Sequence, residues 1–258
     1  MEYALHIKNL ASLSTLENCF NRIYIGSEFC SKLIPALPEL KTAARFAKSE
    51  GLGLTILTSY CSESQLPVYK SIIDFVREDY PEAEIAVNDW GIFNLCVSSG
   101  IKTIIGRLLV KQKNDPRICT AIGSLSSGAR SRAVSIGMNN SLLNFLKKKD
   151  VKRIELNNTL QGVNLDNIND EFIFSLHLPF VFISLTRYCG QDLKDNPEEF
   201  KIKECLFEAC PDIEIYSKNL KLPLFRRGNA IFYKNELLPK SIFSVHHKID
   251  RIVYSQTH

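Results

Sequence analysis

Residues 84–109 read EIAVNDWGIFNLCVSSGIKTIIGRLL, two β-rich runs with a short apolar segment between them. We expect strands at Glu84–Asn88 and Lys102–Leu109 and a short helix at Trp90–Ser98. A helix between two strands is typical of parallel pairing, because the crossover must carry the chain back along the sheet. This stretch therefore predicts one strand–helix–strand unit of a parallel sheet.

The same alternation continues on both sides of this unit. Further strands are expected at Arg22–Gly26, Gly53–Thr58, Val151–Leu156, Glu171–Leu176 and Phe180–Leu185. Further helices are expected at Pro38–Glu50, Pro67–Glu78 and Asn139–Lys149. Repeated units without a glycine-rich phosphate loop favour a barrel over a nucleotide-binding open sheet. We predict an α/β fold, a TIM-barrel-like (β/α) barrel. The pattern does not decide whether the barrel is complete, because it gives fewer secure strands than the eight of a full barrel.

The C-terminal part of the chain differs from this pattern. Short β-like runs surround Arg226–Asn229 and predict an antiparallel hairpin. We expect a single barrel-like domain over residues 1–258, with a cysteine-bearing loop at about 187–212 and a terminal β extension at about 213–258. Residues 111–137 are rich in Lys, Arg, Ser and Gly without a periodic face, which predicts a long loop that serves as a lid or a partner surface.

Composition narrows the class of protein. A chain of 258 residues with 45% apolar content can fill one large core, so disorder is excluded. The net charge of +4 argues only weakly for nucleic-acid binding. The N-terminus MEYALHIKNL lacks the pattern of a secretory signal, and the longest apolar region, Phe172–Leu185, is too short to span a bilayer. We therefore expect a cytoplasmic protein without a membrane partner.

Three of the eight cysteines lie close together in the sequence. Cys189, Cys205 and Cys210 form the pattern C-x15-C-x4-C around a polar stretch. Thiolates are the ligands of iron–sulfur clusters and of structural zinc, and three of them are one short of the usual four. The spacing leaves three alternatives open: an iron–sulfur cluster, a zinc site, or small apolar side chains that bind no metal.

Four segments resemble, in order, segments of the collagenase-like peptidase superfamily, and most of all its ubiquinone-biosynthesis V-type members. They are IYIGSEFCSK (23–32), IAVNDWGIFNL (85–95), KTIIGRLLVKQKNDPR (102–117), and LPFVFISLTRYC (178–189) followed by KECLFEAC (203–210). In those members four cysteines hold a 4Fe–4S cluster. The resemblance implies that the matching ligands here are Cys30, Cys189, Cys205 and Cys210. The relatives have three residues between the last two cysteines, where this chain has four.

The resemblance also implies a function. Such relatives take part in oxygen-independent hydroxylation of a small molecule, such as a ubiquinone precursor, or of an RNA base. They use a prephenate-like oxygen donor and often pair with a homologous subunit. RNA is the less favoured substrate, because the near-neutral charge predicts a small phosphate footprint.

Two alternatives from other classes stand beside this one. The superfamily's peptidase signature E-x-F-x-H-G-A-x-C-x-x-x-S-G-x-C matches securely only at its final cysteine, Cys189, and only loosely at Glu171 and His177, which argues against a collagenase-like peptidase. The other alternative is a non-catalytic scaffold subunit whose cysteines hold zinc or nothing.

Candidate catalytic residues lie where barrels place their sites, at the carboxyl ends of strands. Asn88 and Asp89 follow EIAV, and Arg107 lies in IIGRLL; Glu28 and Asn157 also follow strands. Asp89 suits a base or the orientation of a substrate hydroxyl, and Arg107 suits a carboxylate clamp for a prephenate-like donor. The alternatives are that Asp89 only caps the helix at Trp90 and that Arg107 forms an ion pair at the rim.

Overall fold

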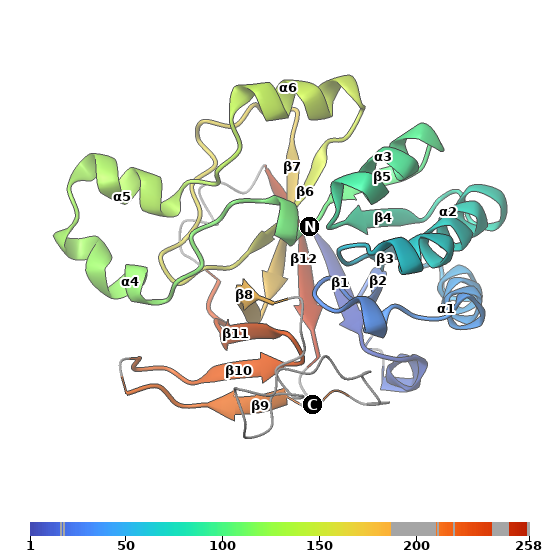
Figure 1. Cartoon of the computed structure of the whole chain (residues 1–258), viewed down its shortest axis with the longest axis horizontal. Helices are drawn as coiled ribbons and strands as arrows, with labels where there is room; N and C mark the ends of the chain where they lie inside the picture. The colour runs from blue at the N-terminus through green and yellow to red at the C-terminus, as the bar shows by residue number, and fades with distance from the viewer. Residues whose placement is uncertain are drawn as a thin grey trace.

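Eight parallel strands close into a barrel in the computed structural model of the chain, which describes residues 1–15, 17, 19–186, 210, 212–218, 220–238 and 248–256 (Figure 1). Around the barrel the strands are β1 (Glu2–Ile7), β2 (Arg22–Gly26), β3 (Gly53–Leu57), β4 (Glu84–Val87), β5 (Lys102–Ile105), β6 (Arg153–Asn157), β7 (Ile173–Leu178) and β12 (Ile249–Ser255). The predicted TIM-barrel-like fold is confirmed, and the barrel is closed.

The sequence pattern missed the two strands that close the barrel. The first and last strands, β1 and β12, pair in parallel through Ala4 and Val253 and lie side by side in Figure 1. The residues of β12 therefore belong to the barrel and not to the terminal extension expected over 213–258. Both strands turn charged or polar side chains towards the barrel interior, Glu2 and Arg251 among them. Their sequences therefore have the polar pattern of exposed segments.

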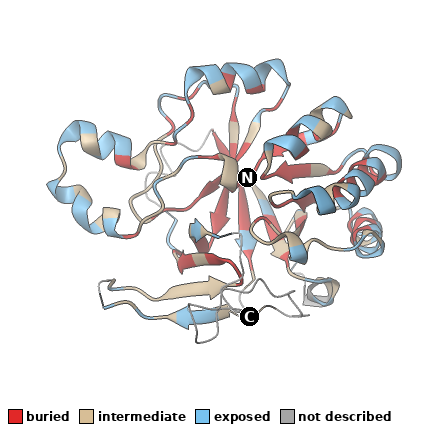
Figure 2. Ribbon diagram, in the orientation of Figure 1, coloured by how far each residue is buried: buried red, intermediate tan, exposed pale blue. Residues whose placement is uncertain are grey.

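Helices cover the outside of the barrel. The predicted helices are present as α1 (Leu37–Ser49), α2 (Leu66–Asp79), α3 (Trp90–Ser98) and α6 (Asn140–Lys148). Figure 2 shows their inward faces buried and their outward faces exposed. Short 3-10 turns are η1 (Leu10–Thr15), η2 (Ser31–Leu33), η3 (Glu63–Gln65), η4 (Arg107–Leu109) and η5 (Ile122–Ser124).

The segment 111–137, expected as a loop, contains helical turns. They are the short helices α4 (Arg117–Ala121) and α5 (Ser127–Val134), which project away from the barrel in Figure 1. Neither shows a broad apolar face, which is why periodicity did not reveal them. In the ranges that the structure describes, no helix has the length and apolar character to cross a bilayer.

A second, antiparallel sheet is inserted between β7 and β12. It contains β8 (Phe180–Leu185), β9 (Asp212–Ile215), β10 (Leu224–Arg227) and β11 (Ala230–Lys234), in the order β8-β11-β10-β9. The strands β10 and β11 form the predicted hairpin, with Gly228 at a φ of 57° in the turn. Phe182 and Phe232 of this sheet pack on Phe29, with ring centroids 4.9 and 5.0 Å away. The sheet therefore lies against the loop that follows β2, at the carboxyl end of the barrel.

Candidate active site

A cavity of about 580 Å³ lies between the carboxyl end of the barrel and the second sheet. Barrel strands and the segments after them contribute His6, Lys8, Glu28, Cys30, Arg107 and Ser255. The inserted segment contributes Phe180, Cys210, Asp212, Phe225, Arg227 and Phe232. This is the end at which barrel enzymes place their sites.

A buried ion pair forms one wall of the cavity. Arg107 Nε donates to both carboxylate oxygens of Glu28, at 3.1 and 3.0 Å, and Nη1 donates to Asn157 Oδ1 at 3.1 Å and to the Phe180 carbonyl at 3.0 Å. Burial opposes ionisation of Glu28, but the charge and hydrogen bonds of Arg107 outweigh it and lower the pKa of Glu28 to about 2. The charge of Arg107 is therefore balanced by Glu28, and its hydrogen bond to the Phe180 carbonyl connects the barrel to β8.

A second charged cluster lies across the cavity. Arg227 Nη2 donates to Asp212 Oδ2 at 2.5 Å, and Lys8 Nζ lies 3.7 Å from the same oxygen. Burial opposes the charge of Asp212, yet the bonds to Arg227 and the charge of Lys8 lower its pKa. The described wall thus holds three cationic side chains, those of Lys8, Arg107 and Arg227. Against them stand two carboxylates, so the wall has an excess of one positive charge when the cysteines are not counted. The cavity is suited to an anionic ligand.

Aromatic rings and cations alternate on the cavity wall. The Arg107 guanidinium carbon lies 5.1 Å from the centre of the Phe29 ring, and that of Arg227 lies 5.5 Å from the Phe180 ring. The Phe180 and Phe225 rings meet edge to face at 6.1 Å. Such a wall can pack a planar or cyclic ligand while the cations face its charged groups.

Cys30 and Cys210, far apart in the sequence, line this same cavity. The other two predicted ligands, Cys189 and Cys205, lie outside the described residues. In the part of the chain that the structure describes, no group of three or more His, Cys, Asp and Glu side chains is arranged to hold a metal. The four-cysteine centre stays a prediction.

The other predicted site residues hold loops in place. Asp89 Oδ1 accepts the backbone N–H groups of Gly91 at 2.7 Å and Ile92 at 3.2 Å, so Asp89 is the N-cap of α3. Asn88 Nδ2 donates to the Thr58 carbonyl at 2.8 Å, and its Oδ1 accepts the Leu108 N–H at 2.9 Å. The structure therefore brings Glu28, Arg107 and Asn157 together and gives Asn88 and Asp89 backbone contacts. A catalytic role for the latter two stays a prediction.

Sequence reasoning missed a histidine–serine pair at the cavity. His6 Nδ1 lies 3.2 Å from Ser255 Oγ, and His6 Nε2 lies 3.0 Å from the Gly26 carbonyl oxygen. Burial lowers the pKa of His6 to about 4, although the nearby Glu28 carboxylate partly opposes this. The two residues can be seen as a pair only once β1 and β12 are known to be neighbouring strands, and the apolar pattern revealed neither strand.

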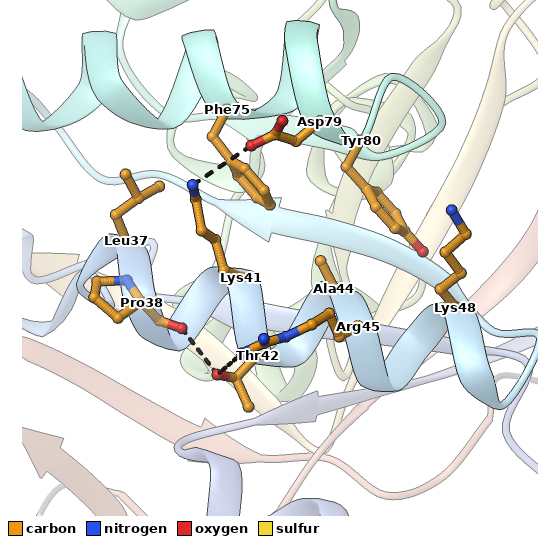
Figure 3. A pocket seen from close by; sticks show the side chains of 10 residues that line it. All are labelled: Leu37, Pro38, Lys41, Thr42, Ala44, Arg45, Lys48, Phe75, Asp79 and Tyr80. Atoms are coloured by element: carbon orange, nitrogen blue, oxygen red, sulfur yellow. Dashed lines mark hydrogen bonds and ion pairs between the residues drawn. The ribbon is translucent and has the colours of Figure 1, made fainter.

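A groove of about 550 Å³ also lies outside the barrel, between α1 and α2 (Figure 3). Its ion pair joins Lys41 Nζ to Asp79 Oδ2 at 3.5 Å, and both side chains are about half exposed, at 48% and 58%. Exposed pairs of this kind are weak, and the other two cations at the groove, Arg45 and Lys48, are exposed, with Arg45 Nη2 donating to Thr42 Oγ1 at 3.3 Å. We assign the candidate site to the barrel cavity, because its charged groups are buried and converge.

Comparisons with known proteins give one similarity in fold. No family model matches the sequence, and no curated protein matches it. A solved structure described as that of the U32 peptidase Mk0906 is similar over 100% of this chain and 93% of that chain, at 10% sequence identity and a TM-score of 0.46. A similarity of this size assigns neither a reaction nor a substrate to the chain.

Proposed function

We propose that this chain is an iron–sulfur protein whose cavity binds a small aromatic or cyclic carboxylic acid during an oxygen-independent hydroxylation. The observation that carries the proposal is that Cys30 and Cys210 line one cavity together with cations and phenyl rings. The sequence resemblance supplies the cluster type and the reaction class.

The contacts around Cys30 fit a centre that includes Cys189. Asn229 Nδ2 donates to the carbonyls of Phe29 and Thr186, each at 2.8 Å. Phe29 precedes Cys30 directly, and Thr186 is three residues before Cys189. Three residues of extended chain span roughly 10 Å. The chain length therefore permits one centre to include both cysteines.

The electrostatics of the wall also fit thiolate ligands. Lys8 and Arg227 share the single carboxylate Asp212, beside Cys210, which leaves positive charge to offset thiolates. When bound, a 4Fe–4S cluster supplies one-electron chemistry or a coordination position for a substrate oxygen. The chain's own groups would do the rest: Lys8 and Arg227 hold a carboxylate, the phenyl rings pack the ring of the ligand, and the Glu28–Arg107 pair fixes the wall.

The size of the cavity favours a small molecule over an RNA base. A volume of about 580 Å³ is typical of small-molecule sites. A net charge of +4 provides little of the counterion release that dominates RNA affinity. A prephenate-like acid has the size, ring and charge that this wall can hold.

The test is iron and sulfide content, with an absorption spectrum, of protein purified without oxygen. We expect about four iron and four sulfide per chain, as all-cysteine ligation of this cluster implies. Cys30→Ala and Cys189→Ala should lose most of both. Cys61→Ala, at the same end of the barrel but outside the four, is the matched control and should keep them. Zinc or no metal in the wild type would overturn the cluster and favour a scaffold role.

Ligand binding is tested separately by calorimetry with 4-hydroxybenzoate and its neutral amide. The carboxylate should bind more tightly than the amide. Arg227→Met should remove that preference, because one cation at the wall is lost. Equal binding of acid and amide to the wild type would contradict the assigned ligand class.

A further inference from the structure

The pair His6–Ser255 lies in the cavity wall and uses none of the groups assigned to the cluster. We propose that Ser255 is a nucleophile and His6 its general base, for acyl transfer from a small ester or activated amide to Ser255 and then to water. This activity goes beyond the proposed function, because no cysteine takes part in it.

The barrel itself sets the geometry of the pair. His6 on β1 and Ser255 on β12 are direct partners in the parallel ladder, so both side chains project from neighbouring strands towards the cavity. Side chains on paired strands are held more firmly than side chains on loops. The distance of 3.2 Å between Nδ1 and Oγ is within the range of a base and its nucleophile.

The third member of the constellation fixes the tautomer of His6. The Gly26 carbonyl oxygen can only accept a hydrogen bond, so His6 Nε2 carries the proton and donates it. Nδ1 then has a free lone pair and accepts the hydroxyl hydrogen of Ser255. A histidine held by an acceptor on one nitrogen and facing a serine on the other has the arrangement of a triad.

Gly26 is suited to this role by its backbone. Its φ is 119°, and a Cβ built there would lie 2.4 Å from the Leu57 carbonyl oxygen. A side-chain-bearing residue cannot adopt this conformation without strain. The orienting carbonyl therefore depends on glycine at this position.

The charges that face His6 suit a base. Burial, together with the charges of His177 and Arg107, lowers the pKa of His6 to about 4, while the hydrogen bond to the Gly26 carbonyl and the carboxylate of Glu28 act in the opposite direction. The ring is therefore neutral near pH 7 and can accept a proton. The ionised Glu28 would stabilise the imidazolium that forms when it does.

The chemistry balances with water as the second reactant. The Ser255 O–H bond breaks, its proton passes to His6 Nδ1, and a bond forms between Oγ and the acyl carbon. The bond from that carbon to the leaving group breaks, and the leaving group takes the proton from His6. Water then attacks the acyl–serine through the same base, which releases the acid and restores Ser255. The phenyl walls favour an ester of a small aromatic acid.

The experiment is labelling with diisopropyl fluorophosphate, followed by intact mass and peptide mapping, together with a burst assay on p-nitrophenyl benzoate. We expect one label per chain, on Ser255. Ser27 lines the same cavity but its hydroxyl accepts the Cys30 N–H at 3.2 Å, so its peptide should stay unlabelled. No label on the wild type, or a label on a different residue, would overturn the proposal.

Two variants separate chemistry from structure. Ser255→Ala should lose the label, and His6→Asn should slow it at least about 100-fold, because an amide can accept the Ser255 hydrogen bond but cannot take its proton. Urea midpoints close to that of the wild type would show that both fold. Labelling of His6→Asn at the wild-type rate would show that His6 is no base. The exposed Ser71→Ala on α2 is the control.

The result can be told apart from the fate of the cluster. Ser255→Ala, which loses the label, should keep the iron and sulfide of the wild type. The labelling rate of the wild type should rise as the pH passes about 4 and stay level from pH 6 to 8, following the deprotonation of His6. A rate that instead rises steadily through this range would exclude His6 as the base.

Discussion

The two ends of the barrel interior are both charged but are built differently. At the amino end, Arg22 Nε donates to Glu2 at 2.7 Å, and Arg251 Nη1 donates to Glu84 at 2.8 Å, so two arginines balance two glutamates. Arg251 also donates to the other oxygen of Glu2. At the carboxyl end, the Glu28–Arg107 pair borders an open cavity with an excess of positive charge. Ion pairs close the amino end of the barrel, whereas the carboxyl end keeps an open cavity.

A buried polar chain joins the two ends. Tyr24 accepts a hydrogen bond from Arg251 at 2.8 Å and donates to Glu155 at 2.9 Å, and Glu155 bonds His177 Nε2. His177 Nδ1 is buried and has no hydrogen-bond partner among the described residues. The charges inside this barrel are therefore balanced by ion pairs at the amino end and are in excess around a cavity at the carboxyl end, which is the end where barrel enzymes place their sites.

The largest expected effect is at the amino end. Arg251→Met should lower the free energy of unfolding by about 3–5 kcal/mol, because Arg22 alone would remain to balance the partly buried carboxylates of Glu2 and Glu84, which leaves one negative charge uncompensated. Urea unfolding measures it. Lys147→Met, which breaks an exposed pair with Glu171, is the control and should cost under about 1 kcal/mol. Equal losses in the two variants would refute the idea that the amino end is held by ion pairs.

The next effect is a pH dependence at the carboxyl end. Glu28 has a pKa of about 2 in the folded chain against an ordinary 4.5, so the unfolded chain takes up this proton first. Its contribution, about 3 kcal/mol, is full above pH 4.5 and is lost as the pH falls towards 2. His6 makes a second contribution to stability, which is lost as the pH falls from its ordinary pKa of 6.5 towards its folded-state pKa of about 4. In that range the His6 ring takes up a proton in the unfolded chain but not in the folded chain.

Unfolding curves at a series of pH values check both contributions. Glu28→Gln should flatten the curve below pH 4.5, and His6→Asn should flatten it between pH 6.5 and 4. Curves parallel to that of the wild type in both windows would show that neither group is coupled to folding.

Gly26→Ala sharpens the comparison at a single backbone position. A φ of 119° and the clash with the Leu57 carbonyl should cost about 1–3 kcal/mol, and labelling of Ser255 should fall as the Gly26 carbonyl moves. Gly51→Ala, at a φ of 66° with open space around it, is the control and should cost about 1 kcal/mol with labelling unchanged. Unchanged labelling in Gly26→Ala would remove this carbonyl from the mechanism.

The smallest effect separates capping from catalysis at Asp89. Asp89→Ala should lower the free energy of unfolding by about 1 kcal/mol through loss of the α3 cap, and Asn139→Ala should do the same at α6. Calorimetry with 4-hydroxybenzoate should give the same affinity in both variants. A loss of affinity in Asp89→Ala alone would support the site role that the sequence predicts.

Much of the fold could be predicted because seven strands and four helices carry a clear apolar pattern. Glu84–Val87 and Trp90–Ser98, for example, match their predicted ranges to within a residue. The strand Phe180–Leu185 was found as well, but its apolar pattern could not show that it leaves the barrel and pairs with β11. Apolar content marks a buried strand and does not identify its neighbour.

The site was predicted only in part for the same reason. Arg107 was expected at a strand end, and Glu28 and Asn157 follow predicted strands. General barrel geometry therefore predicted all three residues at the carboxyl end of the barrel. Their mutual hydrogen bonds join residues that are 50 to 79 positions apart and leave no local trace. His6 and Ser255 are 249 positions apart and lie on strands whose polar interior faces hide them.

The sequence by itself determined the parallel α/β architecture, the positions of most elements and the cysteines that could bind a metal, because these depend on local apolar periodicity and on residue type. The tertiary structure decided that the barrel closes through β1 and β12. It also brought Cys30 and Cys210 to the wall of one cavity and placed His6 in contact with Ser255 and Gly26. These outcomes depend on contacts between distant segments, and the charges inside the barrel make sense only once their partners across it are known.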